Sequence, residues 1–228
     1  MEKRGEVVRE VEGREGEQVR KKSLFREYLE ALVIAVIIAL FIRTFIIQAF
    51  KIPSGSMEPT LLVGDHIFVN KFIYGFRVPF LRKRILKFTS PKRGDIIVFI
   101  FPEDRSKDFI KRVVGVGGDV IEVRDKVLYV NGVPQEEPYV RHVEPSTYIP
   151  RRDDFGPFTV PQGKLFVMGD NRDRSYDSRF WGCVDESDVL GKAFIIYFSI
   201  KNDPDSRWYE FWKLPGRIRW GRIGKLIH

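Results

Sequence analysis

Hydrophobic and polar positions divide the chain into three parts. Residues 1–22 alternate glutamate with arginine and lysine around a few valines, so they cannot bury a core and are expected to form a solvated tail. The stretch that follows, YLEALVIAVIIALFIRTFIIQAF, is apolar without interruption from Ala31 to Ile42 and contains no glycine or proline. Beyond Ile52 come short runs rich in valine, isoleucine and phenylalanine, each bounded by turn-forming residues. This pattern predicts a helix followed by a mainly β domain.

The apolar stretch has the composition of a membrane-spanning helix. Residues 29–42 alone would give ~21 Å of helix, which is too short, because a span needs about 20 residues. Arg43 interrupts the apolar run, but its guanidinium can reach the headgroups while its stem stays in lipid, and continuation to Phe50 makes the helix long enough. The alternative, a buried core helix, lacks a second helix to pack against. We therefore expect a charged tail at residues 1–28 and a single transmembrane anchor at residues 29–50.

Charges around the anchor predict its orientation. Basic residues precede the span, and by the positive-inside tendency they keep the N-terminus in the cytoplasm: Arg14, Arg20, Lys21, Lys22 and Arg26. Residues 51–228 would then form an extracytoplasmic domain at the plasma membrane. A removable signal peptide is the alternative, but only Ser54-Gly55-Ser56 fits a small-x-small cleavage pattern, and Arg43 and Lys51 intervene. An uncleaved anchor is favoured.

The β-rich part contains recognisable hairpin signals. VIEVRDKVLYVNG predicts a hairpin with one turn near Asp125 and a second at Asn131-Gly132, since Asn-Gly favours positive φ. Residues 131–162 are rich in proline and alternate little, so we expect an irregular insert there. The predicted domain is an antiparallel β structure with this inserted lobe.

Composition excludes several kinds of partner and site. The net charge of +8 suits nucleic acid or acidic lipid, but no nucleic-acid-binding module is recognisable. The single Cys183 cannot form an intramolecular disulfide. The GVGGD stretch has Val120 where a dinucleotide-binding motif needs its last glycine. Because the three histidines, His66, His142 and His228, lie far apart without HExxH or paired CxxC, we expect no metal and no cofactor.

The first stretch with candidate chemistry is PSGSMEPT. Two prolines and a glycine fix a tight path around Ser54 and Ser56, so these serines cannot lie in a regular helix. A rigidly held serine suits a nucleophile. The alternative is a structural turn in which a serine caps a short helix that begins at Glu58.

The second candidate stretch is FIKRVVGV. Strand alternation puts Lys111 on one face and Arg112 on the other, so one of these two cations must face apolar neighbours. Burial lowers the pKa of a lysine because it penalises the ammonium form, and a neutral amine can then act as a base. Arginine cannot do this. The alternative is a surface lysine whose head reaches water.

The third candidate stretch, GDNRDRSYDSRFWG, brings three aspartates together at Asp170, Asp173 and Asp177, which suggests a calcium loop. However, the EF-hand glycine is missing and three arginines offset the negative charge. We therefore predict that the aspartates form internal ion pairs, and that the arginines nearest to them take part: Arg172, Arg174 and Arg179.

Ser56 and Lys111 together supply a nucleophile and a base, a variant of the Ser-His-Asp arrangement that needs neither histidine nor metal. PSGSMEPTL, FIKRVVGVGGD and GDNRDRSYDSRFWG, in this order after an N-terminal anchor, closely resemble the conserved boxes of bacterial type I signal peptidases, or leader peptidases. The resemblance covers about residues 29 to 200, and the ending RWGRIGKLIH also resembles that family's C-terminus. It implies a membrane-anchored, mostly antiparallel β domain that removes signal peptides from exported preproteins after small-x-small sequences.

The same resemblance implies a role for each site residue. Ser56 corresponds to the nucleophile and Lys111 to the neutral general base, while the Ser54 hydroxyl and the Ser56 backbone N–H correspond to the oxyanion hole. Further matched positions are a serine that orients the lysine amine and a supporting pair: Ser175, and Asp177 with Arg179. Lysine at position 111, where the endoplasmic-reticulum branch has histidine, favours a bacterial or organellar type. The implied partners are secretory preproteins, membrane phospholipid and the protein export machinery, with no nucleic acid.

Other readings stay open at this point. A catalytically inactive, membrane-anchored adaptor could bind signal sequences without cutting them, and self-cleaving repressors use a Ser-Lys dyad but lack a membrane span. Residues 72–81 and the tryptophan- and arginine-rich tail from Trp208 to Lys225 are equally compatible with headgroup contact and with an aromatic core under solvated charges.

Overall fold

The computed structural model describes residues 24–77, 84–201 and 214–228. The chain divides into two units, Met1–Phe41 and Ile42–His228, which we describe separately. The predicted tail at residues 1–28 therefore lies outside the described residues except for its last five positions, which are helical.

The N-terminal helix α2 runs over Leu24–Phe45 and has no buried residue. It is long and apolar enough to cross a membrane, with Arg43 in its last turn, where a cation interacts favourably with the helix dipole. The prediction that the helix continues to Phe50 is wrong. Residues Ile47–Lys51 form strand β1, which pairs with residues 66–70, and Phe50 packs against a core cluster. The strand's partner lies far along the sequence, so the apolar run alone could not reveal where the helix ends.

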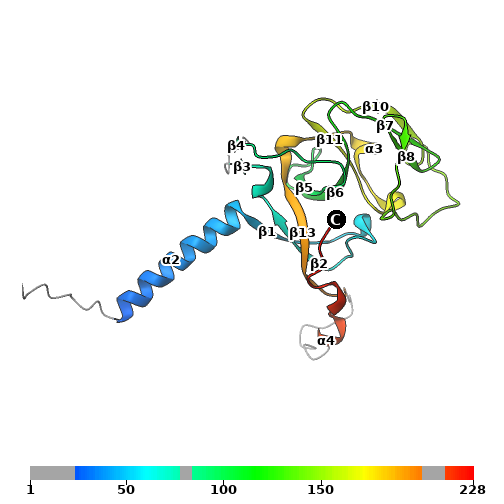
Figure 1. The fold of residues 1–228 in the computed structure, drawn as a ribbon. Helices are drawn as coiled ribbons and strands as arrows, with labels where there is room; N and C mark the ends of the chain where they lie inside the picture. The colour runs from blue at the N-terminus through cyan, green and yellow to red at the C-terminus, as the bar shows by residue number, and fades with distance from the viewer. Residues whose placement is uncertain (1–23, 78–83, 202–213) are drawn as a thin grey trace, which may run out of the picture. The chain divides into compact units, whose positions relative to one another are not determined.

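A seven-stranded antiparallel sheet forms the centre of the second unit (Figure 1). Its strand order is β1-β2-β13-β5-β6-β11-β12. The predicted mainly antiparallel β fold is thereby confirmed. The strands of this sheet besides β1 are β2 (Asp65–Asn70), β5 (Ile96–Ile100), β6 (Asp108–Val116), β11 (Lys164–Met168), β12 (Val184–Asp185) and β13 (Val189–Ser199).

A second sheet of order β10-β7-β8-β9 contains the predicted hairpins. Asp125 and Lys126 both have positive φ between the first two strands, and Asn131 and Gly132 have positive φ at the next turn. Both are two-residue turns of the kind that matches strand twist, so the hairpin prediction is confirmed. The strands are β7 (Val120–Arg124), β8 (Val127–Val130), β9 (Val133–Pro134) and β10 (Phe155–Thr159).

The predicted irregular insert at residues 131–162 is only partly irregular. Residues 135–154, all of them described, contain no helix or strand beyond an isolated bridge between Arg141 and Asn171. Residues Phe155–Thr159, in contrast, pair with β7 as an edge strand. A proline is tolerated at a sheet edge, which explains why the Gly156-Pro157 step concealed this strand in the sequence.

Short elements lie between the strands of the seven-stranded sheet and after its last strand in sequence, β13, and two of them carry Ser56 and Arg179. They are η2 (Gly55–Met57), η3 (Phe72–Tyr74), β3 (Phe76–Arg77), β4 (Arg84–Leu86), η4 (Arg172–Arg174), α3 (Ser178–Trp181), η5 (Glu186–Asp188), α4 (Leu214–Arg217) and η7 (Trp220–Arg222).

The C-terminal segment packs against the residues around the first candidate stretch, PSGSMEPT. Ile227 is buried in one core cluster together with Met57 and Leu61. The buried carboxylate of Asp65 accepts hydrogen bonds from Arg219 and Arg222, and Arg222 also donates to the backbone oxygen of Thr60. Residues 52–65 are thus held on one side by residues 219–228.

Candidate active site

Ser56 lies in the one-turn 3₁₀ helix η2, between residues that anchor it to the core. Met57 on one side and Ile52 on the other are buried, and Ser56 itself is buried. Ser54 precedes the turn in extended conformation and makes no capping hydrogen bond through its side chain. The alternative in which a serine serves only as a helix cap is therefore wrong for Ser54. Its hydroxyl is exposed on the wall of a cleft.

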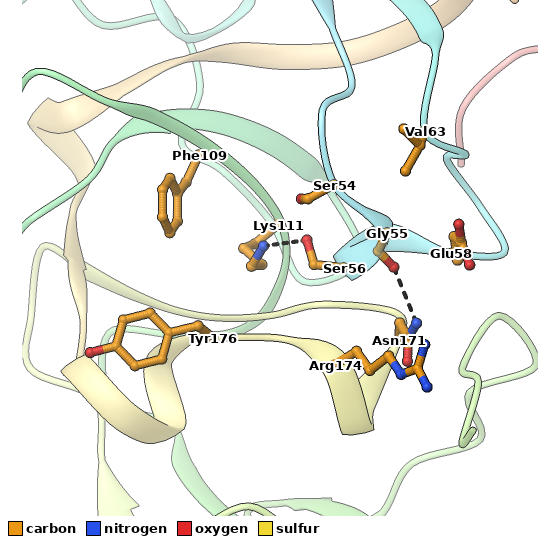
Figure 2. Close-up of a pocket in the computed structure, with 10 residues that line it drawn as sticks. All are labelled: Ser54, Gly55, Ser56, Glu58, Val63, Phe109, Lys111, Asn171, Arg174 and Tyr176. Atoms are coloured by element: carbon orange, nitrogen blue, oxygen red, sulfur yellow. Dashed lines mark hydrogen bonds between the residues drawn. The ribbon is translucent and has the colours of Figure 1, made fainter. Parts of the chain in front are cut away.

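Lys111 lies in the middle of β6, and its amine reaches the nucleophile candidate. Nζ donates hydrogen bonds to Ser56 Oγ at 2.7 Å and to the backbone oxygen of Ile110 at 3.1 Å (Figure 2). Only 4% of the lysine is exposed, so it is not a surface lysine. Burial lowers the pKa of Lys111 to about 8, against the opposing charges of Asp177 and Asp170. The amine is therefore far easier to deprotonate than an ordinary lysine.

The neighbouring Arg112 is also buried, on the opposite face of β6. Its guanidinium makes two hydrogen bonds of 2.8 Å to the carboxylate of Asp170 and lies 3.7 Å from the centre of the Tyr139 ring. Thr60 donates a further hydrogen bond to Asp170. Strand alternation thus buries two cations rather than one, and the paired carboxylate explains why the arginine side tolerates it.

Asn171 holds the turn that carries Ser56 in place. Its backbone N–H donates to the backbone oxygen of Ser56, and its side-chain Nδ2 donates to the backbone oxygen of Gly55, each at 3.1 Å (Figure 2). No local pattern singles out this asparagine, because the contact joins two segments separated by more than a hundred residues. Only its place inside the third stretch connected it with the site.

The loop behind Ser56 has no room for another atom. A Cβ on Gly169 would collide with both the Ser175 hydroxyl and the backbone oxygen of Ser56. The expected hydrogen bond from Lys111 to Ser175 is not formed: among the described residues the amine's partners are Ser56 and Ile110. The Ser175 hydroxyl is buried without a hydrogen-bond partner in this part of the chain. It lies near enough to Asp177 to lower that carboxylate's pKa, although the geometry is not that of a formed hydrogen bond.

Asp177 and Arg179 form the buried pair expected to support the site. The guanidinium makes two hydrogen bonds of 2.9 Å to the carboxylate, and Asp177 also accepts the backbone N–H of Gly169. Arg179 donates in addition to the backbone oxygens of Arg152 and Arg172. Burial raises the pKa of Asp177, but the charge of Arg179 outweighs it, so the net pKa is lowered and the carboxylate stays ionised.

All three aspartates form ion pairs, as predicted, but only Asp177 pairs with one of the predicted arginines, Arg179. Asp170 pairs with Arg112 and Asp173 lies beside Arg152, both outside the third stretch. The prediction was wrong for Arg172 and Arg174, which pair with Glu137 and Glu144. Across residues 24–77, 84–201 and 214–228 there is no group of three or more His, Cys, Asp or Glu side chains that could hold a metal ion.

A cleft of about 460 Å³ opens over the Ser56–Lys111 pair. Figure 2 shows Phe109 and Tyr176 at the lysine end of this cleft, and Glu58 and Arg174 at the opposite end. The site thus combines a serine hydroxyl, a buried lysine amine, and a cleft with one aromatic and one polar end.

Comparison with known proteins identifies the family. A model described as signal peptidase, peptidase S26, matches residues 25–198 of the chain. The chain belongs to this signal peptidase family. It is similar to signal peptidase I of Pseudomonas fluorescens, with 39% identity over 80% of this chain and 76% of the relative. It is also similar to signal peptidase I of Bacillus licheniformis, at 38% identity over 78% of this chain and 91% of the relative. Signal peptidase I of Aquifex aeolicus is 36% identical over 77% of this chain and 85% of the relative.

Membership of the signal peptidase family confirms several predictions. The chain is a serine peptidase, and the substrates of its family are preproteins that carry signal peptides. The apolar helix α2 is consistent with the membrane anchoring of a signal peptidase I. The resemblance that the three sequence stretches suggested is therefore correct.

Proposed function

We propose that this chain is a membrane-bound serine endopeptidase that removes N-terminal signal peptides from exported preproteins through a dyad of Ser56 and Lys111. The observation that carries the proposal is the 2.7 Å hydrogen bond between the two side chains, with the amine almost completely buried. A lysine with a pKa near 8 is neutral in a useful fraction of molecules at physiological pH, as a general base must be.

In the first half of the reaction, Lys111 accepts the Ser56 proton while Oγ attacks the scissile carbonyl carbon. A C–O bond forms, and the negative charge that develops on the carbonyl oxygen is stabilised by the Ser54 hydroxyl and the Ser56 backbone N–H. Losing one such donor typically costs about 3 kcal/mol of transition-state stabilisation. The C–N bond then breaks, and the Lys111 ammonium gives its proton to the leaving amine.

In the second half, water hydrolyses the acyl-enzyme. The neutral Lys111 amine takes a proton from the water as its oxygen attacks the ester carbon, and the Ser56 Oγ leaves and is reprotonated by the same lysine. One amine therefore serves both steps. The supporting pair, Asp177 and Arg179, fixes the loop that carries Gly169 against the back of Ser56. Ser175 would orient the amine after a rotation of its buried hydroxyl.

The substrate would bind as an extended strand, paired along a sheet edge, with alternate side chains in two shallow pockets. Because a strand points every second side chain the same way, a requirement for small residues at two positions separated by one is explained by exclusion of bulk. Cleavage after small-x-small sequences follows from this binding mode.

The membrane part of the proposal starts from α2. We infer that it anchors the enzyme in the plasma membrane as a single span, with the N-terminus cytoplasmic and residues 51–228 extracytoplasmic, near the export machinery. Further phospholipid contact would involve Trp220, which is 65% exposed. Arg219 and Arg222 contribute less to such contact than the sequence suggested, because both are bound to Asp65. Trp208, Trp212 and residues 78–81 lie outside the described residues.

Incubation of the detergent-solubilised full chain with a preprotein tests the function. We expect cleavage after a small residue, insensitive to chelators, that disappears in Ser56→Ala and in Lys111→Ala. Ser106→Ala and Lys107→Ala, on an exposed turn, are the matched controls. Cleavage that survives in either dyad variant would refute the assigned dyad. Binding of the signal peptide without any cleavage would instead support the inactive adaptor.

A further inference from the structure

Two aromatic side chains, Phe109 and Tyr176, line the lysine end of the cleft, and Phe101 and Phe180 pack against them. We call these four side chains the aromatic wall. Phe109 begins the wall, with its ring centre 5.5 Å from the Lys111 amine. Phe101 stacks on Phe109 at 4.2 Å, and Tyr176 meets the Phe101 ring edge-on at 6.3 Å. The wall thus extends from the reacting centre outward without a break.

Tyr176 is the member of the wall that faces the cleft most openly, since 51% of its surface is exposed. It is nevertheless held from three directions. Its ring stacks on Phe180 at 5.6 Å and touches Phe101, and its hydroxyl donates a 3.0 Å hydrogen bond to Glu103 on the turn between β5 and β6. An exposed ring that is fixed in this way cannot swing aside without losing all three contacts.

The position of the ring matters because the scissile carbonyl must lie against Ser56 Oγ, next to the Lys111 amine. Any substrate side chain that points from there toward the lysine end meets Phe109 first and Tyr176 next (Figure 2). Phe109 also packs into the core of the sheet, whereas Tyr176 covers the cleft from a loop. The free space at this end is therefore set by the tyrosine.

We propose that Tyr176 is a specificity-determining residue that limits the size of the substrate side chain accepted at the lysine end of the cleft. This inference rests on the proposed function and adds to it the identity of a residue that excludes bulk. A fixed ring rejects a larger side chain far more strongly than a mobile one, and differences of a single methylene in a pocket change kcat/KM by about 10- to 200-fold.

Peptide cleavage by the full chain in detergent provides the test. The reference peptide carries alanine at the scissile-carbonyl residue and at the residue two before it, and two further peptides replace one alanine each by leucine. In Tyr176→Ala we expect the ratio of kcat/KM for alanine over leucine to fall at least tenfold at one of the two positions. Tyr176→Phe, which keeps the ring and loses the hydroxyl, should stay within about threefold of wild type. Arg174→Ala, at the opposite end of the cleft, is the control for a general loosening.

Tyr176→Trp tests the same inference in the other direction and keeps an aromatic ring in the wall if the alanine variant does not fold. It should increase the preference for glycine over alanine at the affected position. Unchanged ratios in both variants, with the alanine peptide still cleaved, would overturn the role of Tyr176 alone. If the wild-type chain cleaves none of the peptides in a Ser56-dependent way, the proposed function fails and this inference with it.

Discussion

Lys111 and Arg112 are consecutive residues of β6, and both are buried cations, yet their surroundings differ. Arg112 is matched by the carboxylate of Asp170 through two hydrogen bonds, while Lys111 has a hydroxyl and a backbone oxygen as partners. The lysine therefore bears the cost of burial without a directly bound counterion, and its pKa falls. One face of the strand thus carries a cation paired with a carboxylate, and the other carries the amine that we propose as the base. A buried cationic side chain can lose its proton near neutral pH only where no carboxylate pairs with it.

Replacing the proposed base, Lys111, by a permanently charged side chain should have the largest effect on activity. In Lys111→Arg, position 111 can no longer be neutral, so proton abstraction from Ser56 is lost and kcat/KM should fall by about 10³-fold or more. Steady-state cleavage of a preprotein by the purified variant measures this. Lys107→Arg, exposed on its turn, is the matched control. Activity within tenfold of wild type would mean that the amine is not the base.

Breaking the buried pair of Arg112 and Asp170 should instead reduce the stability of the fold. Asp170→Asn leaves the buried Arg112 without its carboxylate, and the loss of one partner of a buried pair typically costs about 3 to 5 kcal/mol. Urea unfolding of the full chain in detergent gives the free energy of unfolding. Glu122→Gln, which breaks the exposed pair with Arg124, should leave that free energy nearly unchanged. Equal effects of the two substitutions would contradict the distinction between the two faces of β6.

The pH dependence of activity should show the smallest but most specific effect. Because only the neutral amine of Lys111 is a base and its pKa is about 8, kcat/KM should rise about tenfold per pH unit below that value and level off above it. Asp170 raises the pKa of Lys111, so Asp170→Asn should move the midpoint to lower pH where the variant folds. A midpoint near 10 or above, typical of an exposed lysine, would show that the amine is hydrated in the working enzyme.

Local chemistry made part of this structure predictable from the sequence. The Asn131-Gly132 turn and its hairpin follow from the backbone preferences of those two residues. The stretches around Ser56 and Lys111 could be recognised as candidate chemistry from their local sequences alone. That one of the two cations, Lys111 or Arg112, is desolvated could be anticipated from strand alternation among apolar residues. The third stretch, with its alternating charges, correctly predicted ion pairs, although only Arg179 of its arginines pairs with one of its aspartates.

The features that could not be predicted from the sequence depend on contacts between residues that lie far apart along the chain. The end of α2 at Phe45 is set by pairing of β1 with β2, and the strand at 155–159 by an edge position beside β7. Asn171 and Gly169 matter because their loop packs against the back of Ser56, which no local pattern reveals. That the Ser175 hydroxyl makes no hydrogen bond to Lys111 is likewise a property of the packed loop.

The ion pair between Asp65 and Arg222 affects how early a newly made chain can become active. Residues near Ser56 pack against Ile227, and Arg222 binds the backbone of Thr60, so the site needs a segment that lies 162 residues further along the chain. A nascent chain lacks that support until this segment has been synthesised. We therefore expect newly made molecules to stay inactive until residues 219–228 have folded against residues 52–65.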